Sequence, residues 1–369
     1  MNIAEIRMRK IEMPLRYPFQ THAGQVNDRE LIIIEIMDIE GRKGFGEVTA
    51  FSTPFYTSET SESAWLVLRR IFLPAVNWHQ IVHPSNMASQ LSIWQGNRMA
   101  KAGLEAALWD LYGKQLNKSL SQLIGGSRSY VESGVVLSLA DKLEEVIANY
   151  QNEGYRRYKL KIEKYKEGQM IDEIKAYAPS LPLMIDANGL YEEKDIPYLQ
   201  SLDSKGLMMI EQPFRPGDFY LHQQLQNQLD TPLCLDESLT SLADVKQAVL
   251  MGSCQIINIK ISRVGGMTEA LAIHEWSRKN NIPVWCGGMV ESGISKAHNI
   301  ALASLDGFII PGDISASARF WERDLIIPEV EVKQGRIKVP LDPGIGFKVD
   351  EEYLQFVTQN SYIFQPDIS

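Results

Sequence analysis

The middle of the chain alternates short apolar, β-rich runs with segments of helical periodicity. Between residues 156 and 263 the runs are RRYKLKIE, LPLMIDAN, LMMIEQP, PLCLDES and IINIKISR. The residues that follow each run place apolar side chains at the spacing of one helix face. Repeated strand-helix units of this kind predict a parallel sheet covered by helices.

An ionisable residue stands in or just after each of these five runs. These residues are Lys161, Asp186, Glu211, Asp236 and Lys260, at intervals of 25, 25, 25 and 24 residues. A (β/α)8 barrel uses about 250 residues for eight units, so a period near 25 fits one compact strand and its helix. Because the strands of a barrel are parallel, we expect the five side chains to converge on the carboxyl mouth, where such barrels carry their active sites.

The three acids of this series have two interpretations. Asp186 and Asp236 could simply cap the helices that follow, which is a common use of Asp. Three acids on consecutive strands, however, repel each other by about 4 kcal/mol per pair at 4 Å and an effective dielectric near 20. A cation between them would relieve this repulsion, and all-oxygen ligands favour Mg²⁺ first and Mn²⁺ second. We therefore interpret Asp186, Glu211 and Asp236 as metal ligands.

The lysines on the second and sixth strands are candidate acid and base groups. Strand alternation places Lys159 and Lys161 on one face, and Lys260 shares its face with Asn258 and Ser262 across the barrel. Burial near a metal ion and another ammonium lowers a lysine pKa towards the range of a useful base, whereas carboxylates oppose that shift. The alternative is that these lysines only form salt bridges with the neighbouring acids.

The first part of the chain has a different pattern, in which strands come first and helices follow. The predicted strands are 3–13, 30–37 and 44–48, and the predicted helices are 62–71 and 99–115. Two polar and aromatic loops, 16–25 and 50–58, interrupt the strands. Each is either an ordinary surface connection or a lid over the barrel mouth. These elements predict an α+β domain.

A change of pattern after Gly126 marks the expected domain boundary. The first barrel strand is expected at 131–139 and the eighth at 307–311, and the 182 residues from Val131 to Asp313 give 26 residues for each of seven intervals. The last segment has no further unit of this kind and is expected to return to the first domain. The predicted organisation is a first domain of residues 1–126 completed by about 340–369, and a barrel domain of residues 127–339.

Composition narrows the class of function. The formal net charge is −9 and the basic residues are scattered, so nucleic acid is not an expected partner. No run approaches the 18 apolar residues that a membrane span needs. The three cysteines, Cys234, Cys254 and Cys286, lie in the barrel segment and read as reduced thiols. We expect a cytoplasmic enzyme that acts on a small molecule.

The motifs together resemble the enolase superfamily, and in particular its muconate-lactonizing subgroup. KLK, MIDAN, IEQP, LDES and NIK, around the five residues of the series, carry the resemblance over nearly the whole chain. The resemblance implies an α/β fold, a modified (β/α)7β TIM barrel closed by an α+β capping domain. It also implies that Lys161 and Lys260 are the acid/base pair, that Lys159 is an auxiliary cation and that the three acids bind Mg²⁺.

Two further motifs, GGMVESG and PGDISAS, resemble the family of o-succinylbenzoate synthases and N-succinylamino acid racemases. This resemblance implies Mg²⁺-dependent syn dehydration of 2-succinyl-6-hydroxy-2,4-cyclohexadiene-1-carboxylate to o-succinylbenzoate in menaquinone synthesis. Racemisation of N-acylamino acids is the alternative, possible as a second activity, and a non-catalytic barrel that binds a metal-carboxylate ligand is a third reading. A homo-oligomer and a small carboxylate substrate are also expected. The implied substrate-binding residues are Asn188, Phe19, Phe55, Gly288, Met289, Glu291 and Arg263.

The chain departs from the common family pattern at a few positions. Ile261-Ser262 and Ser295-Lys296 replace residues that the family often shows as Pro-Gly and Gly-Arg. Arg263 is retained, and in this group that arginine accompanies racemase activity. The run Asp313-Ile314-Ser315 lacks the D-x-D of dipeptide epimerases and argues against that activity.

Overall fold

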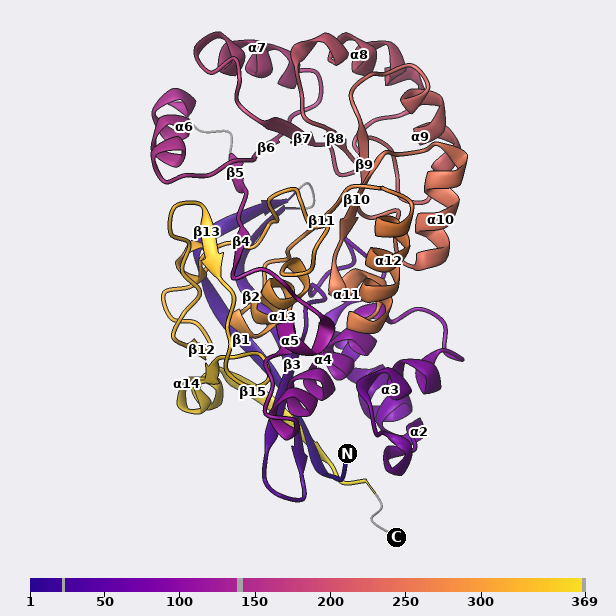
Figure 1. Cartoon of the computed structure of the whole chain (residues 1–369), viewed down its shortest axis with the longest axis vertical. Helices are drawn as coiled ribbons and strands as arrows, with labels where there is room; N and C mark the ends of the chain where they lie inside the picture. Colours follow the sequence, from indigo (N-terminus) through magenta and orange to yellow (C-terminus); the bar gives the residue numbers. More distant parts are fainter. Residues whose placement is uncertain (22–23, 138–141, 367–369) are drawn as a thin grey trace.

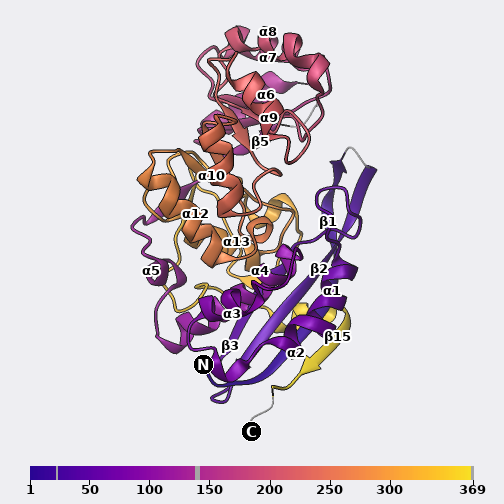
Figure 2. The same ribbon diagram turned by 90° about the vertical axis from the view of Figure 1, so that its right-hand side faces the viewer.

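The computed structural model describes residues 1–21, 24–137 and 142–366. Figures 1 and 2 show a barrel built from the middle of the chain and, below it, a sheet with helices that we call the cap. The cap sheet is antiparallel in the order β15-β1-β2-β3. Its strands are β1 (Ile3–Thr21), β2 (Gly24–Asp38), β3 (Lys43–Val48) and β15 (Thr358–Phe364).

The cap sheet is buried on both faces because alternate residues of β2 enter two different cores. Ile32, Ile34 and Ile36 pack among the cap helices, whereas Leu31 and Ile33 join the large core that continues into the barrel. The two-residue period of a strand produces this division. The sheet therefore connects the cap to the barrel.

The helices of the cap follow the first three strands. They are α1 (Ser61–Val67), the π-helix η1 (Leu68–Phe72), α2 (Leu73–Ala75), the 3₁₀ helix η2 (Trp78–Gln80), α3 (Pro84–Leu91), α4 (Arg98–Gln115) and α5 (Leu120–Ile124). Glycines bring α4 against β3: a Cβ at Gly46 would lie 2.1 Å from the carbonyl oxygen of Gly103. The α+β prediction for this region is confirmed, with the helix at 62–71 divided into α and π turns.

The hairpin of β1 and β2 corrects one expectation. Residues 16–25 were expected to form a loop, but β1 continues to Thr21 and β2 starts at Gly24, with Phe19 paired to Val26. The register shifts between Pro14 and Phe19, so the strands pair again beyond the irregularity. This end of the hairpin projects from the body of the cap (Figure 2), and its residues 16–18 are exposed, so polar side chains are compatible with strand structure here. Residues 50–58 do lack a regular element, apart from one bridge at Phe51.

The barrel sheet holds seven parallel strands in the order β11-β10-β9-β8-β7-β6-β5. They are β5 (Val135–Leu137), β6 (Tyr158–Lys161), β7 (Leu183–Asp186), β8 (Ile210–Glu211), β9 (Leu233–Leu235), β10 (Ile256–Ile259) and β11 (Val284–Cys286). Helices alternate with these strands along the chain, as the strand-helix pattern predicts. The modified TIM-barrel fold class is confirmed.

The first and eighth barrel strands differ from their predicted form. The expected strand at 131–139 is divided into β4 (Tyr130–Glu132) and β5, and residues 138–139 lie outside the described part. The segment expected as the eighth strand, 307–311, makes one isolated bridge, Phe308 with Val284, and the next residue, Gly312, bridges Ser133. These bridges lie on its two sides, so an irregular segment closes the barrel where a regular strand was predicted.

The outer helices and the last elements complete the molecule. They are α6 (Leu143–Asn152), α7 (Glu167–Tyr177), η3 (Glu193–Asp195), α8 (Ile196–Ser201), η4 (Asp203–Lys205), α9 (Phe219–Gln226), α10 (Leu242–Met251), α11 (Ile261–Val264), α12 (Met267–Lys279), α13 (Gly293–Ala303), η5 (Ser317–Arg319), β12 (Ile326–Ile327), β13 (Arg336–Lys338), β14 (Lys348–Val349) and α14 (Glu351–Phe356). β13 pairs with β4, and β15 pairs with β1 in the cap. The end of the chain thus returns to the first sheet.

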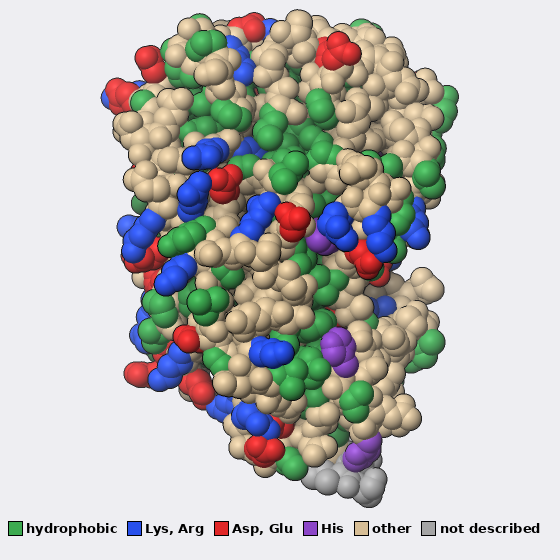
Figure 3. Space-filling model, viewed as in Figure 1, with side chains coloured by type: hydrophobic (Ala, Val, Ile, Leu, Met, Phe, Trp, Pro, Cys, Tyr) green, Lys and Arg blue, Asp and Glu red, His purple; other side chains and the backbone are tan. Residues whose placement is uncertain are grey.

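Two surface observations bear on partners. On the face seen in Figure 3, Lys and Arg side chains lie among Asp and Glu side chains and form no continuous basic field. Of the helices in residues 1–21, 24–137 and 142–366, none has the length and apolar character required to cross a bilayer.

Candidate active site

The ionisable residues of the sequence series meet inside the barrel at the carboxyl ends of its strands. Lys161 pairs in register with Asp186, and Asp186 pairs with Glu211. Lower in the interior lies a separate apolar cluster, to which alternate strand residues contribute. Its buried members are Met184, Met209, Cys234, Ile256, Trp285 and Ile310. The charged layer therefore rests on an apolar floor that excludes water from below.

Lys159 lies in the barrel interior, surrounded by carboxylates. Its Nζ lies 2.7 Å from Glu211 Oε2, 2.8 Å from Asp313 Oδ2 and 3.4 Å from Asp186 Oδ2, and 4.9 Å from the centroid of the Trp285 ring. Burial opposes the charged form, but the three carboxylates outweigh it and raise the Lys159 pKa well above its usual value. The three carboxylates thus favour the charged form of Lys159 inside the barrel.

Lys161 lies two residues further along β6 and opens towards the mouth. Its Nζ donates to Asp186 Oδ2 at 2.6 Å and to Asn188 Oδ1 at 2.9 Å. Asn188 in turn donates to Glu237 Oε1 at 2.9 Å. The Lys161 side chain is 38% exposed, whereas that of Lys159 is 4% exposed. Of the two, Lys161 is the amine that a molecule entering the mouth would meet.

Lys260 lies on the other side of the mouth, at the junction of β10 and α11. Its Nζ donates to Asp236 Oδ2 at 2.8 Å and to the Tyr56 hydroxyl at 2.9 Å, and it lies 4.8 Å from the centroid of the Tyr56 ring. Burial again opposes the charge, but Asp236 outweighs it and raises the Lys260 pKa above its usual value. Because β10 ends at Ile259, the expectation that Ser262 shares a strand face with Lys260 is wrong: Ser262 lies in α11.

Arg263 bonds the oxygen of Asp236 that Lys260 does not contact. Its guanidinium bonds Asp236 Oδ1, and its Nε donates to the Leu239 carbonyl at 2.7 Å. Arg263 is 2% exposed, so its described contacts are internal to the barrel. Burial raises the pKa of Asp236, but Lys260 and Arg263 overcome this effect and hold that pKa below its usual value. Arg263 thus contacts the site through Asp236.

The three acids of the series have the oxygen ligands of a hard-metal site, although lysine and arginine side chains of the protein already form ion pairs with them. In residues 1–21, 24–137 and 142–366, no three or more His, Cys, Asp or Glu side chains are assembled as a metal-binding group. The donor set nevertheless fits a divalent ion: Asp186, Glu211 and Asp236 supply only oxygens, and all three are buried. Glu211 Oε2 is in ion-pair range of Lys159 but lacks hydrogen-bond geometry, and Glu237 Oε2 has no hydrogen-bond partner in the described residues.

Burial and the neighbouring charges act in opposite directions on the pKa values of the acids. Burial first, and then the neighbouring Asp186, raise the pKa of Glu211 to about 7, against the effect of Lys159. Burial and Asp236 likewise raise the pKa of Glu237 to about 8. Asp186 shows the opposite result, because Lys161 and Lys159 overcome the effect of burial and lower its pKa. Burial and like charge thus dominate at Glu211 and Glu237, whereas bound cations dominate at Asp186.

Three residues of the site were missed by sequence reasoning. Tyr56 comes from the 50–58 loop and bonds both Lys260 and Asp236, at 2.9 Å and at 3.3 to 3.4 Å. Asp313 joins Lys159 to Arg157, and Glu237 holds Asn188. Asp313 follows the expected eighth strand and Glu237 follows a series acid, so strand position could have signalled both. The contact between Tyr56 and Lys260 depends on how the cap packs on the barrel, so only the fold reveals it.

The implied substrate-binding residues lie in different surroundings. The Phe55 ring lies 4.6 Å from the Phe51 ring in the cap loop, while the Phe19 side chain falls outside the described part. Glu291 faces inwards: its carboxylate accepts from Asn299 Nδ2 at 2.9 Å and from the Met289 amide at 3.2 Å. A Cβ at Gly288 would lie 2.2 Å from the Asp313 carbonyl. Glu291 and Gly288 therefore shape the loop after β11.

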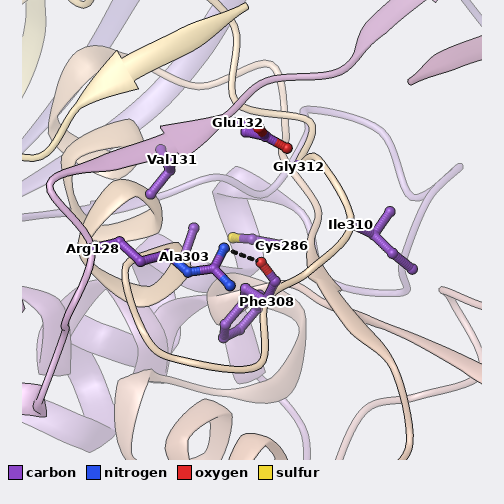
Figure 4. A pocket seen from close by; sticks show the side chains of 8 residues that line it. All are labelled: Arg128, Val131, Glu132, Cys286, Ala303, Phe308, Ile310 and Gly312. Carbon is purple, nitrogen blue, oxygen red and sulfur yellow. Dashed lines mark hydrogen bonds between the residues drawn. The ribbon is translucent and has the colours of Figure 1, made fainter. Parts of the chain in front are cut away.

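A small cavity at the closing seam of the barrel is separate from this site. Figure 4 shows it beside the segment that replaces the eighth strand, where Arg128 donates to the Phe308 carbonyl. Its lining residues are Arg128, Val131, Glu132, Cys286, Ala303, Phe308, Ile310 and Gly312. None of the series residues is among them.

Gly287 provides a prediction about Lys260. A Cβ at this position would lie 2.2 Å from Asn258 Oδ1 and 2.7 Å from Lys260 Cε. Gly287→Ala should therefore displace Lys260 and lower kcat by about 10-fold or more, since small misplacements of reacting groups are costly. Gly168→Ala, where the nearest contact is 3.3 Å, is the control. Equal kcat values for the two variants would contradict the expectation.

The comparisons with known proteins agree with this geometry. Residues 3–125 match the mandelate racemase / muconate lactonizing enzyme N-terminal domain, and residues 141–353 match the enolase C-terminal domain-like family. The chain belongs to the enolase superfamily. A crystal structure of an enolase-superfamily member from Listeria innocua superposes with a TM-score of 0.96, at 42% identity and complete coverage of both chains.

Two of the activities named among the relatives of this enolase-superfamily enzyme match the activities that the motifs imply. The o-succinylbenzoate synthase of Bacillus subtilis is 45% identical over 97% of both chains. The N-succinylamino acid racemase of Thermus thermophilus is 37% identical over 97% of this chain and 98% of the relative. Members of the superfamily typically use a divalent metal ion. The resemblance inferred from the motifs is thus confirmed at the level of the family.

Proposed function

We propose that this enzyme is an o-succinylbenzoate synthase. The reaction is the Mg²⁺-dependent syn dehydration of 2-succinyl-6-hydroxy-2,4-cyclohexadiene-1-carboxylate in menaquinone synthesis. The observation that carries the proposal is the placement of Lys161 on β6 and Lys260 at the end of β10, each bonded to a buried acid. Synthases that are 43–45% identical over nearly the full length of this chain support it.

Lys161 is assigned as the base that removes the α-proton of the substrate. Its side chain is 38% exposed at the mouth, and that of Lys260 is 9% exposed. A syn elimination removes the proton and the hydroxyl from the same face, so Lys161 can return the proton to the leaving hydroxyl, which departs as water. Lys260, held charged by Asp236, faces the opposite side and stabilises the developing negative charge. Lys159 adds positive charge from below.

Asp186, Glu211 and Asp236 are assigned as the residues that would hold Mg²⁺, with Mn²⁺ as a substitute. Such an ion would supply positive charge to the substrate carboxylate when the α-proton leaves. The protein's part is to exclude water with the apolar floor and to bring the acids together in register. Lys159 and Lys161 would remain beside the acids as further positive charge.

The cap is assigned the recognition of the substrate. Phe19 and Phe55, on the hairpin and the 50–58 loop, would contact its apolar part, while Asn188 beside Lys161 and Met289 after β11 would complete the walls. Loops at a barrel mouth can vary without disturbing the strands that carry the chemistry. Arg263, Gly288 and Glu291 would act indirectly, because their described contacts hold the protein itself.

Racemisation of N-succinylamino acids is the second candidate. It needs an amine on each face of the α-carbon, and Lys161 and Lys260 lie on opposite sides of the mouth. The racemase of Thermus thermophilus at 37% identity favours keeping this activity as a possible second one. A binder without catalysis would need only the acids, and it is the weakest of the three candidates. We also propose that the enzyme is a cytoplasmic homo-oligomer, with domains 1–126 plus 340–369 and 127–339.

Turnover of the cyclohexadiene carboxylate tests the proposed function. With Mg²⁺ present, the purified enzyme should convert it to o-succinylbenzoate, followed by the absorbance change as the ring becomes aromatic. N-succinylamino acids, assayed by polarimetry, measure the second candidate under the same conditions. Rapid racemisation without dehydration would reject the synthase assignment and favour the racemase.

A further inference from the structure

A buried carboxylate of the cap, that of Glu105 in α4, contacts the barrel helix α12. Its Oε1 accepts from the Thr268 backbone amide at 3.1 Å, from the Thr268 hydroxyl, and from Trp109 Nε1 at 3.0 Å. Glu105 is 1% exposed. Thr268 is the second residue of α12. A carboxylate from the cap therefore satisfies the first turn of a barrel helix, where free backbone N–H groups favour a negative charge.

The other oxygen of the same carboxylate lies against a glycine turn. Oε2 has no hydrogen-bond partner in the described residues, and a Cβ at Gly266 would lie only 1.7 Å from it. Gly265 and Gly266 have φ values of +98° and +138°, which residues with a Cβ rarely adopt. A side chain at position 266 would therefore clash with the Glu105 carboxylate, and glycine leaves the space that this carboxylate occupies.

This turn is continuous with the backbone of Lys260. The Val264 amide donates to the Lys260 carbonyl at 3.1 Å, and the Gly266 amide donates to the Ile261 carbonyl at 3.0 Å. Arg263, in the same turn, bonds Asp236, which is the acid partner of Lys260. One short hydrogen-bonded segment therefore runs from the Glu105 contact to Lys260. The described hydrogen bonds of Lys161, on β6, go to Asp186 and Asn188 and involve none of this segment.

We infer that Glu105 is a positioning residue for Lys260. The cap helix α4 holds the turn after β10 in register, and the turn fixes the direction from which the Lys260 ammonium approaches the mouth. The inference rests on the proposed function, because it assigns Glu105 to one of the two lysines and not to the other. A displacement of about 1 Å at a reacting group can lower a rate by 10²-fold, so loss of the contact has a measurable consequence.

The test compares proton exchange at the two faces of the α-carbon. Lys161→Ala retains exchange of one enantiomer of an N-succinylamino acid, and this enantiomer reports on Lys260. In D₂O, Glu105→Ala should slow α-proton exchange of this enantiomer by about 10-fold or more. Exchange of the other enantiomer should stay within about 2-fold of wild type. Glu105→Gln retains an acceptor for Thr268 and should recover most of the rate. An equal loss for both enantiomers, or no loss for either, would overturn the inference.

Backbone hydrogen exchange gives a second readout that needs no activity. In Glu105→Ala, amides of residues 261–268 should exchange several-fold faster, because a helix N-terminus loses its acceptor, while those of residues 158–161 should not change. Glu269→Gln is the matched control: Glu269 lies on α12 as well, but it accepts from the Leu242 amide of α10 at 2.6 Å. Unchanged protection at 261–268 in Glu105→Ala would contradict positioning.

Misfolding of the variant and failure of the proposed function can each be distinguished from failure of the inference. If Glu105→Ala does not fold, Thr268→Val takes its place, because it removes only the hydroxyl donor. Slower exchange through Lys260 alone would support the inference, and an equal loss for both enantiomers or no loss would overturn it. If the wild-type enzyme neither dehydrates nor exchanges, the proposed function fails by itself. The protection of residues 261–268 then still decides whether Glu105 holds the turn beside Lys260.

Discussion

Lys161→Ala is expected to abolish dehydration, with a loss of at least about 10²-fold, because the α-proton loses its general base. The same variant should still exchange the α-proton of one enantiomer of an N-succinylamino acid in D₂O, through Lys260. Lys260→Ala should show the mirror pattern with the other enantiomer. Its dehydration should fall through loss of the charge that Asp236 holds beside the substrate. Proton NMR of the recovered substrates measures both exchanges.

The control for these variants is Lys164→Ala. Lys164 is three residues beyond Lys161, and its ammonium bonds Asp195 at 2.6 Å, away from the acid cluster. It should leave both exchanges near the wild-type rate. If neither Lys161→Ala nor Lys260→Ala retained exchange of a single enantiomer, the assignment of one lysine to each face would fail, even if dehydration itself were confirmed.

Asp236→Asn is expected to remove nearly all activity, as is excess chelator with the wild-type enzyme. The amide has one oxygen and no charge, so it weakens ion coordination and also the contacts with Lys260 and Arg263. Titration calorimetry with Mg²⁺ should show at least about 10-fold weaker binding than wild type, since carboxylates are the preferred ligands of this ion. Turnover of both proteins is followed in parallel.

A surface carboxylate supplies the control for charge alone. Glu275→Gln removes one negative charge from an exposed i,i+4 pair with Lys279, and both Mg²⁺ binding and turnover should remain at the wild-type level. Undiminished turnover of the wild type in excess chelator would remove the metal from the mechanism. Loss of Mg²⁺ binding in Glu275→Gln would show that net charge, and not Asp236, determines the affinity.

Much of the barrel could be predicted because its signals are local. A period of 25 residues follows from the length of one strand and helix, and alternation within a strand determines which side chains share a face. The prediction that Lys159 and Lys161 face the same side therefore holds, as both approach Asp186. The first sheet was predictable for the same reason, since Leu31 to Ile36 is an apolar, β-branched run interrupted only by Glu35.

The errors lie where local pattern and tertiary contact disagree. Residues 16–25 look like a polar loop, yet β1 and β2 pair again at residues 19–21 and 24–26. The segment at 307–311 has the spacing of a strand, but closure of the barrel requires this segment and the next residue, Gly312, to meet β11 on one side and Ser133 on the other, and they make only isolated bridges. Ser262 has the spacing of a strand face, but α11 begins one residue after Lys260.

The sequence by itself determined the strand-helix period, the faces of the strands and the family, because each depends on residues that are near one another or in fixed motifs. Only the tertiary structure decided which distant groups complete the site. Tyr56 meets Lys260 across 204 residues, and Glu105 meets Thr268 across 163. No periodicity encodes such contacts, since they depend on how the cap packs against the barrel, and that packing is set by the shapes of two buried cores.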